Sequence, residues 1–325
     1  MLAVSLAAAA VGAGAGSAAP RPLAVLGFQA EWAPPSLIAL NAPAITLVGA
    51  QGIDLVGKGR FAEPDAKLLA QLAQAKASGR PAVLLVGNVS RTGDFAERLA
   101  YRTLRSPAAT ANAAAQVARI VRTEGWAGVS VDLESLAARD TAGLSRFVER
   151  LHRDLPAGDS LTICLEASRS LPKYAARGYD LAQLELDVDQ VVLMTYDLHG
   201  PWERRPGPIG PPDWQRGAVA TLERFVPARK VFLGVADYGY AWGPHHRTGT
   251  LTVAGARALV VQRHAKARWV KTAAEWTAKL SDGATLWWSD ARSIAVRAAL
   301  ARRLGVHGIA VWSLGSGDPI PVSAR

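Results

Sequence analysis

Two carboxylates, Asp132 and Glu134, stand two residues apart at the end of the apolar segment Gly128–Glu134. Alternate side chains of a strand share a face, so a strand here would turn Ser130, Asp132 and Glu134 one way and the apolar residues the other. Two carboxylates at that range push one pKa upward, which lets one group hold a proton near neutral pH, as a general acid must. A helix cap or an ion pair at a strand end is the plainer explanation of the same pair.

Two further apolar runs end in side chains that could bind or position a substrate. Tyr196 and Asp197 follow one run, and Trp312 stands near the end of another. The hydroxyl of Tyr196 could serve a site or be tied to the backbone, and Asp197 could cap the next segment. The flat face of Trp312 could stack against a ligand or pack in the core.

The elements that must position these residues are short apolar runs that alternate with longer amphipathic stretches. Near-continuously apolar strands are typical of a parallel sheet covered on both faces. The predicted strands are Leu23–Gln29, Ala44–Gly49, Ala82–Gly87, Gly128–Glu134, Leu161–Ala167, Val191–Tyr196, Lys230–Val235 and Gly308–Leu314. The predicted helices include Asp65–Ala77, Ala108–Thr123, Leu144–Asp154 and Ser293–Leu304.

Eight such strands with intervening helices predict an α/β protein, a (β/α)8 TIM barrel, whose active site would lie at the carboxyl ends of the strands. A doubly wound open sheet is the alternative, but no GxGxxG or Walker loop supports nucleotide binding. Between strands seven and eight, three alternating segments predict a small α+β insertion at about residues 243–289. The proline-rich segment Pro201–Pro212 is expected to be a loop.

Composition excludes several classes of protein. Half of the residues are hydrophobic, which excludes an intrinsically disordered chain. The single cysteine, Cys164, excludes a disulfide framework and a thiolate zinc site. The 37 basic and 27 acidic residues give a net charge of +10. This excess favours anionic surroundings, but the basic residues are scattered without interleaved aromatics, so we expect no nucleic-acid partner.

Residues 1–20 are expected to be an apolar leader, and residues 21–325 one catalytic barrel. Leu2–Ala19 is rich in alanine and glycine and ends at Pro20, as in the small-residue cleavage region of a secretory signal. No Lys or Arg precedes Arg21, and a membrane-spanning helix is the competing interpretation. We expect a bacterial protein that is exported, whether secreted, periplasmic or associated with the cell wall.

The segment Trp126–Glu134 resembles the DGxDxDxE signature of glycoside hydrolase family 18, the chitinase family. Three later segments resemble its sixth, seventh and eighth strands: Val192–Trp202, Lys230–Trp242 and Gly308–Gly315. Leu286–Ile294 and Gly27–Trp32 are most similar to the branch with peptidoglycan- and spore-cortex-processing members, and Gly207–Trp214 to certain bacterial polysaccharide-processing proteins. The chain departs from the signature at Ala127 and Ser130, where the family has aspartates.

The resemblance implies a retaining, substrate-assisted hydrolysis of β-1,4-linked N-acetylhexosamine polymers, either chitin-like chains or peptidoglycan glycan. Glu134 would be the acid and base, Asp132 would orient the 2-acetamido group that attacks the anomeric carbon, and Tyr196 would hydrogen-bond its oxygen. No cofactor is implied. Candidate substrate-binding residues are Phe28, Met194, Asp197, Trp202, Tyr238, Trp242 and Trp312.

Two other functions remain open from the sequence. A catalytically silent, lectin-like protein on the same fold would usually lack the acid, which is present here as Glu134. A basic protein that binds anionic polymer by charge alone would need neither Glu134 nor Trp312. A metal site from His199, His245 and His246 lacks the required ligand spacing and is not expected. We expect a monomer whose partner is an N-acetylhexosamine polysaccharide, with association to an anionic cell envelope.

Overall fold

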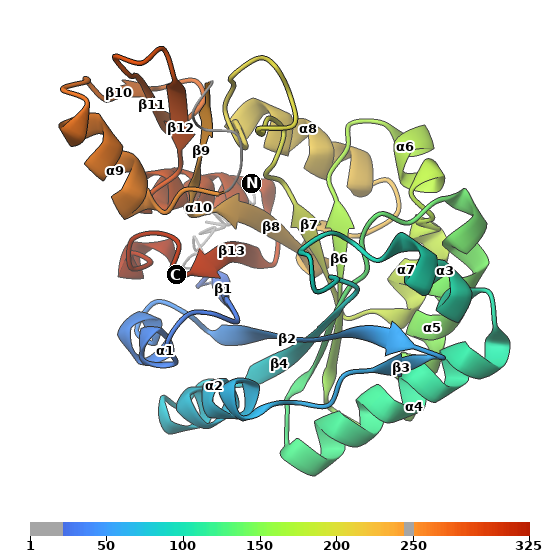
Figure 1. Cartoon of the computed structure of the whole chain (residues 1–325). Helices are drawn as coiled ribbons and strands as arrows, with labels where there is room; N and C mark the ends of the chain where they lie inside the picture. Colours follow the sequence, from blue (N-terminus) through green and yellow to red (C-terminus); the bar gives the residue numbers. More distant parts are fainter. Residues whose placement is uncertain (1–21, 244–249) are drawn as a thin grey trace, which may run out of the picture.

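The computed structural model describes residues 22–243 and 250–325. Eight parallel strands close into a barrel in the order β1-β13-β8-β7-β6-β5-β4-β2, with β2 pairing back to β1 (Figure 1). These strands are β1 (Ala24–Gln29), β2 (Leu47–Gly57), β4 (Ala82–Gly87), β5 (Gly128–Asp132), β6 (Ser160–Glu166), β7 (Gln190–Met194), β8 (Val231–Ala236) and β13 (Gly308–Leu314). The predicted (β/α)8 barrel is confirmed.

Helices connect the strands and cover the outside of the barrel (Figure 1). They are α1 (Ser36–Asn41), α2 (Ala66–Ala77), α3 (Glu97–Leu104), α4 (Pro107–Glu124), α5 (Thr141–Asp154), α6 (Leu171–Ala176), α7 (Leu181–Asp187), α8 (Pro212–Leu222) and α10 (Ala291–Leu304). Local capping explains why two predicted helices start where they do. Asp65 accepts the Leu68 amide before α2, and Ser106 accepts the Ala109 amide before α4.

The strand predicted at Ala44–Gly49 has different limits, because β2 starts at Leu47 and continues to Gly57. Beyond the apolar run it pairs antiparallel with the short strand β3 (Arg60–Phe61). Gly52 suits this extension because a Cβ atom there would lie 2.3 Å from Cδ2 of Leu68 on α2. The extension carries Asp54, which is the register partner of Gly87 on β4.

The barrel has two apolar layers. Side chains that point outward pack against the helices, and Val129, Val131 and Leu133 belong to this outer core. A smaller cluster fills the barrel interior and includes Phe28, Cys164 and Phe232. Cys164 is a free, buried thiol. The alternation predicted for the segment 128–134 is therefore present, and it leaves Asp132 and Glu134 on the inner side.

In its described residues, the predicted insertion between the seventh and eighth barrel strands is a four-stranded antiparallel sheet with one helix (Figure 1). Its elements are β9 (Gly239–Trp242), α9 (Val253–Gln262), β10 (Arg268–Val270), β11 (Glu275–Lys279) and β12 (Thr285–Trp288). The sheet begins at Gly239, ahead of the predicted start at about residue 243, because β9 pairs with β12. Trp288 is buried in the core of the insertion.

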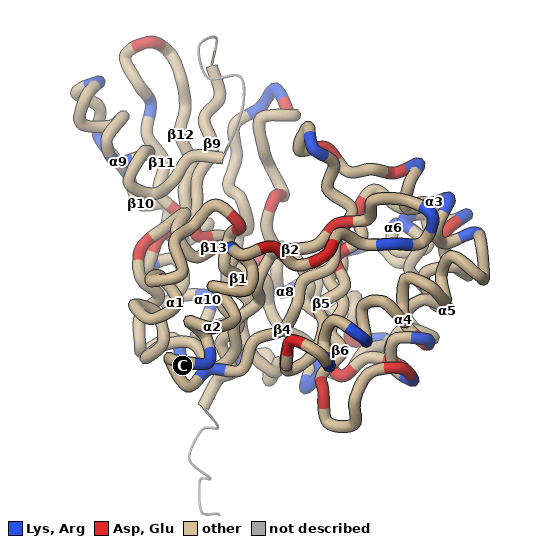
Figure 2. Tube along the Cα trace, turned by 60° about the horizontal axis from the view of Figure 1, so that its bottom comes forward, with Lys and Arg blue, Asp and Glu red and all other residues tan. Residues whose placement is uncertain are grey.

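Charged residues are spread over the molecule, with Lys and Arg interspersed among Asp and Glu along the outer elements (Figure 2). The expected leader, residues 1–20, lies outside the described residues. In the described part of the chain, no helix combines the length and the apolar character needed to cross a membrane.

Candidate active site

The paired carboxylates lie where β5 ends and the chain turns. Asp132 is the last residue of the strand, and Glu134 follows it before Ser135, which adopts a left-handed backbone with φ of +56°. The backbone of Glu134 is fixed by Asn88, whose amide donates to the Glu134 carbonyl at 2.9 Å and whose Oδ1 accepts the Glu134 amide at 2.8 Å. Asn88 is fully buried, so it positions the acid.

The environment favours the protonated form of both carboxylates. Burial, followed by the charges of Asp54 and Glu166, raises the pKa of Asp132 to about 7. Burial also raises the pKa of Glu134 well above its ordinary value, and the charges of Asp132 and Glu166 add to this. A carboxyl group that keeps its proton near neutral pH can act as a general acid.

One oxygen of Asp132, Oδ1, is buried and has no hydrogen-bond partner among the described residues. Such an atom is costly unless a proton or a ligand satisfies it. Ser130 does not satisfy it, because the Ser130 hydroxyl lies 3.5 Å from Sγ of Cys164. The site therefore offers a buried acceptor at the place where a bound molecule could donate an N–H.

Tyr196 and Asp197 leave β7 at a sharp change of backbone direction. Thr195 donates its hydroxyl to the Gly234 carbonyl at 2.7 Å, and Gln215 on α8 donates to the Thr195 carbonyl at 3.0 Å. Asp197 then takes a left-handed conformation with φ of +59°. These contacts fix the backbone at Thr195, from which the chain continues to Tyr196 and Asp197.

Asp197 accepts hydrogen bonds from two tyrosine hydroxyls. Tyr238, between β8 and β9, donates to Oδ1 of Asp197, and Tyr240 on β9 donates to the same oxygen at 2.8 Å. Burial raises the pKa of Asp197, and the two hydroxyls act in the opposite direction. Burial also raises the pKa of Tyr196 well above its ordinary value, so its hydroxyl remains a donor.

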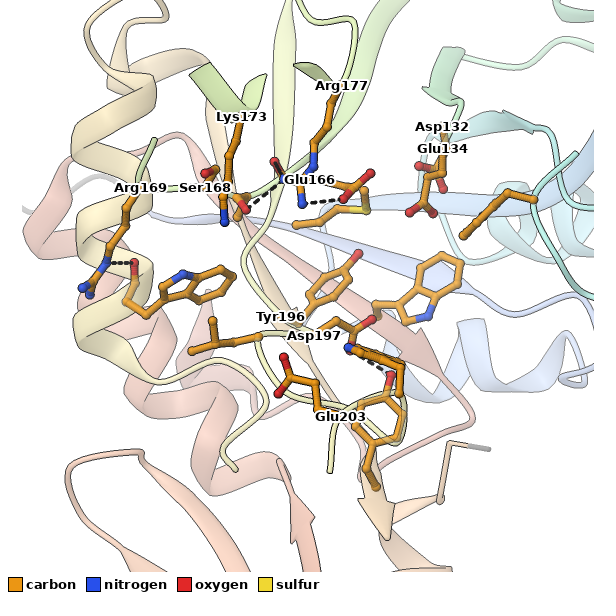
Figure 3. Close-up of a pocket in the computed structure, with 18 of the residues that line it drawn as sticks. Asp132, Glu134, Glu166, Ser168, Arg169, Lys173, Arg177, Tyr196, Asp197 and Glu203 are labelled. Carbon is orange, nitrogen blue, oxygen red and sulfur yellow. Dashed lines mark hydrogen bonds and ion pairs between the residues drawn. The ribbon is translucent and has the colours of Figure 1, made fainter. Parts of the chain in front are cut away.

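These groups line one cavity of about 840 Å³ (Figure 3). The structure brings eight of the predicted site residues to it: Asp132, Glu134, Met194, Tyr196, Asp197, Trp202, Tyr238 and Trp312. Trp202 is 63% exposed at its rim. A cavity of this size with apolar walls and a few polar groups is typical of a binding site for a small molecule or a chain segment.

Two predicted substrate-binding residues do not line the cavity. Phe28 is buried in the barrel interior and packs against Trp312, with ring centroids 5.4 Å apart. Trp242 is buried in the insertion, where its indole N–H donates to the Gly200 carbonyl at 3.0 Å. Both side chains support the site from behind, because Phe28 packs against Trp312 and Trp242 packs against Tyr240 of the cavity wall, with ring centroids 6.1 Å apart.

Sequence reasoning missed several lining residues that come from the end of β6 and from the segment after it. Glu166 forms an ion pair with Arg177 at 2.9 Å, and Lys173 lies on the same wall (Figure 3). Glu166 could have been recognised as a charged residue at the carboxyl end of a predicted strand. Lys173 and Arg177 carry no local signal, because only the fold brings α6 to the cavity.

In the described part of the chain, no group of three or more metal-ligating side chains could hold an ion. His199 is paired with Glu203 at 2.7 Å. His245 and His246 lie outside the described residues.

A buried carboxylate pair at the carboxyl end of a (β/α)8 barrel is one arrangement that glycosidases use. The model of the family "Glycosyl hydrolases family 18" matches residues 61–317. The chain belongs to glycoside hydrolase family 18.

Relatives and solved structures agree with this assignment. A Bacillus subtilis protein named as a sporulation-specific glycosylase is 29% identical, over 69% of this chain and 55% of its own length. The cortical fragment-lytic enzyme of the same species is 26% identical, over 85% of this chain and 66% of its own. The chain thus spans about half to two thirds of these relatives. A chitinase from Chromobacterium violaceum superposes with a TM-score of 0.82 at 26% identity, covering 93% of this chain and 97% of that one.

Proposed function

We propose that the chain hydrolyses β-1,4-linked N-acetylhexosamine polymers with retention of configuration, using the 2-acetamido oxygen of the substrate as the nucleophile. The observation that carries this proposal is the carboxylate pair at the end of β5, in which burial raises both pKa values. The charge of Asp54 adds to this at Asp132, and the charge of Asp132 adds to it at Glu134. Asp132 and Glu134 also face one cavity with Tyr196 and Asp197 (Figure 3). The relatives whose names denote chitin- or cortex-degrading activity support the same substrate class.

Each residue has a defined step in this reaction. Glu134 donates its proton to the glycosidic oxygen, and the bond between that oxygen and the anomeric carbon breaks. The acetamido oxygen forms the new bond to the anomeric carbon, giving an oxazolinium ion. The unpaired Oδ1 of Asp132 accepts the acetamido N–H, and the Tyr196 hydroxyl donates to the acetamido oxygen. Ionised Glu134 then takes a proton from the water molecule that attacks the anomeric carbon and opens the oxazolinium ring.

Turnover of N-acetylglucosamine oligomers by the wild type and by Glu134→Gln tests the activity. The amide keeps the shape but delivers no proton, so hydrolysis should fall at least about 10²–10⁴-fold while binding of the oligomers persists. Glu124→Gln, an exposed residue at the end of α4, is the matched control and should hydrolyse at the wild-type rate. Tight binding without any wild-type turnover would establish a lectin-like protein instead.

Proton NMR of a fresh hydrolysate tests the mechanism. Two inversions at the anomeric carbon release the β anomer first, and a cyclic thiazoline that mimics the oxazolinium should inhibit. An inverting reaction, with Asp132 or Asp197 activating water, would release the α anomer first and would tolerate a missing acetamido group. An initial α-anomer signal contradicts substrate assistance.

One observation favours carboxylated glycans, such as muramic-acid strands, over neutral chitin. The wall of the cavity after β6 carries Arg169, Lys173 and Arg177 (Figure 3). Asp213 pairs with Arg169 at 2.7 Å and Glu166 with Arg177 at 2.9 Å. Lys173 has no carboxylate partner within the described residues. A lactyl carboxylate on a bound sugar chain would provide this partner.

The test compares the rates of hydrolysis of muramic-acid strands and of the same strands with methyl-esterified carboxyl groups. The two substrates differ in charge while their shape is nearly the same. The wild type should prefer the free carboxylate, and Lys173→Gln should reduce that preference about five- to tenfold. Lys67→Gln, an exposed residue on α2, is the control and should retain it. Equal turnover of both strands by the wild type would contradict the preference while leaving the glycosidase assignment intact. A carboxylated wall polymer as substrate also agrees with a place at the bacterial cell envelope.

A further inference from the structure

Asp54, Gly87 and Asp132 form a row across three adjacent barrel strands, β2, β4 and β5. Gly87 is the register partner of Asp54 on one side and of Asp132 on the other. In a parallel sheet, residues in register direct their side chains to the same face, so a side chain at Gly87 would project to the face that Asp132 uses. The middle position of the row carries no side chain.

The carboxylate of Asp54 occupies the space that Gly87 leaves free. A Cβ atom on Gly87 would lie 2.7 Å from Oδ1 of Asp54, closer than real contacts allow. The same Oδ1 accepts the backbone amide of Val89 at 2.6 Å, which fixes the carboxylate over Gly87. Asp54 is thereby held on the side of the row where Asp132 stands.

We propose that Asp54 is a positioning residue that supplies, from β2, the negative charge beside Asp132. On β5 itself the neighbouring inward residue is Ser130, which is uncharged and whose hydroxyl is hydrogen-bonded to the Cys164 thiol. The inference rests on the proposed function, in which Asp132 must be tuned between a neutral and an ionised form. The titratable groups around Asp132 are Asp54 from β2, Glu134 beyond the end of its own strand, Cys164 and Glu166 from β6, Tyr179 before α7, and Tyr196 after β7.

Electrostatics agrees with the geometry. After burial, the charge of Asp54 is the largest cause that raises the pKa of Asp132, ahead of Glu166. Burial also raises the pKa of Asp54, and the charge of Glu31 adds to this, whereas the Val89 amide opposes it. Removing the charge at Asp54 should therefore lower the pKa of Asp132.

The test is Asp54→Asn, because the asparagine Oδ1 can still accept the Val89 amide while the charge is lost. The titration of the Asp132 carboxyl is followed by ¹³C NMR in the free protein, and its signal is assigned with Asp132→Asn. We expect the midpoint of this titration to fall by about half to one pH unit in Asp54→Asn. The acid limb of the pH profile of kcat/KM should move to lower pH by a similar amount. Asp54→Ser is a second neutral variant, to be used if the Asp54→Asn protein does not fold.

Glu124→Gln removes the same charge at the opposite end of the barrel and should leave the Asp132 midpoint in place. An unchanged midpoint in Asp54→Asn, or a loss of activity with no shift of the acid limb, would show that Asp54 only holds Val89 and would overturn the proposal. The NMR midpoint needs no turnover. A wild type without hydrolysis would therefore count against the proposed function, and the titration would still decide the role of Asp54.

Discussion

Asp197 is held by two tyrosine hydroxyls, Tyr238 and Tyr240, that converge on one of its oxygens. Hydrogen bonds to a charged group contribute about 1.5–3 kcal/mol, and they also fix the direction of the carboxylate. Asp197 already has a left-handed backbone, so its side chain depends on these donors for its place in the cavity.

Tyr238→Phe should therefore lower kcat/KM on N-acetylglucosamine oligomers about tenfold, with the barrel still folded by circular dichroism. Tyr101→Phe, on α3 and outside the cavity, is the matched control. A Tyr238→Phe enzyme with wild-type kinetics would mean that Asp197 needs only one of its two donors.

Trp312 could serve substrate binding or core packing, because it lines the cavity and also packs against Phe28. If its free face floors a sugar subsite, Trp312→Ala should weaken oligosaccharide binding, measured by calorimetry in the Glu134→Gln background. The free energy of unfolding should then fall by less than the roughly 3–5 kcal/mol of a buried tryptophan. A loss in that range with unchanged binding would identify core packing as its main role.

At the scale of elements, a buried ion pair joins the insertion to the loop after β7. Glu275 on β11 accepts the amides of Ile209 and Gly210 at 2.7 and 2.8 Å, and Arg297 on α10 binds Glu275 at 2.9 Å and the Gly210 carbonyl at 2.8 Å. Both charged side chains are almost fully buried. The pair fixes the proline-rich loop that follows Asp197.

Breaking such a pair leaves one buried charge uncompensated, which typically costs about 3–5 kcal/mol. We expect Glu275→Gln to lower the free energy of unfolding in urea by roughly that amount. The double variant Glu275→Gln/Arg297→Met should recover part of the loss, because no charge is then left buried. Equal stability of the wild type and Glu275→Gln would show that the carbonyl acceptors alone satisfy Arg297.

The barrel strands could be predicted because each is buried on both faces and therefore reads as an apolar run. The end of β2 could not, since Gln51 and Asp54 interrupt its apolar pattern and its pairing with β3 is a tertiary event. The predicted insertion, at about residues 243–289, left out β9 for a related reason, because this strand exists through its pairing with β12.

The candidate site likewise contains residues that the sequence predicts and residues that only the fold brings to it. Strand alternation placed Asp132 and Glu134 on the inner face, and both line the cavity. Asn88 follows the predicted strand Ala82–Gly87 without any sign of a role in the site, yet it is buried against the backbone of Glu134. That contact joins residues 46 positions apart, so no local pattern could predict it.

At the scale of the whole molecule, the buried carboxyl groups make stability depend on pH. Because the pKa of Asp132 is higher in the folded chain than in the unfolded chain, the folded state binds more protons between about pH 4 and about pH 7. Stability from this group is fully present below about pH 4 and is lost as the pH rises through about 7. Glu134 acts in the same direction.

Asp132→Asn should therefore lose less stability than the wild type between pH 4 and pH 8, as measured by urea unfolding at each pH. Asp94→Asn, an exposed aspartate, should follow the wild-type curve. Parallel curves for the wild type and Asp132→Asn would mean that Asp132 titrates normally in the folded protein.

The strand β9 has a consequence for engineering by recombination. Tyr240 lies on the first strand of the insertion sheet, opposite Trp287 on β12, yet its hydroxyl holds Asp197 beside the barrel. A chimera that exchanges the whole insertion for one from another family member would also import a foreign contact to Asp197. Grafts that alter substrate range should keep residues 238–242 from the recipient and place the junction beyond Trp242. The recipient then keeps the hydrogen bond from Tyr240 to Asp197, and the Asp197 carboxylate stays in place while the specificity changes.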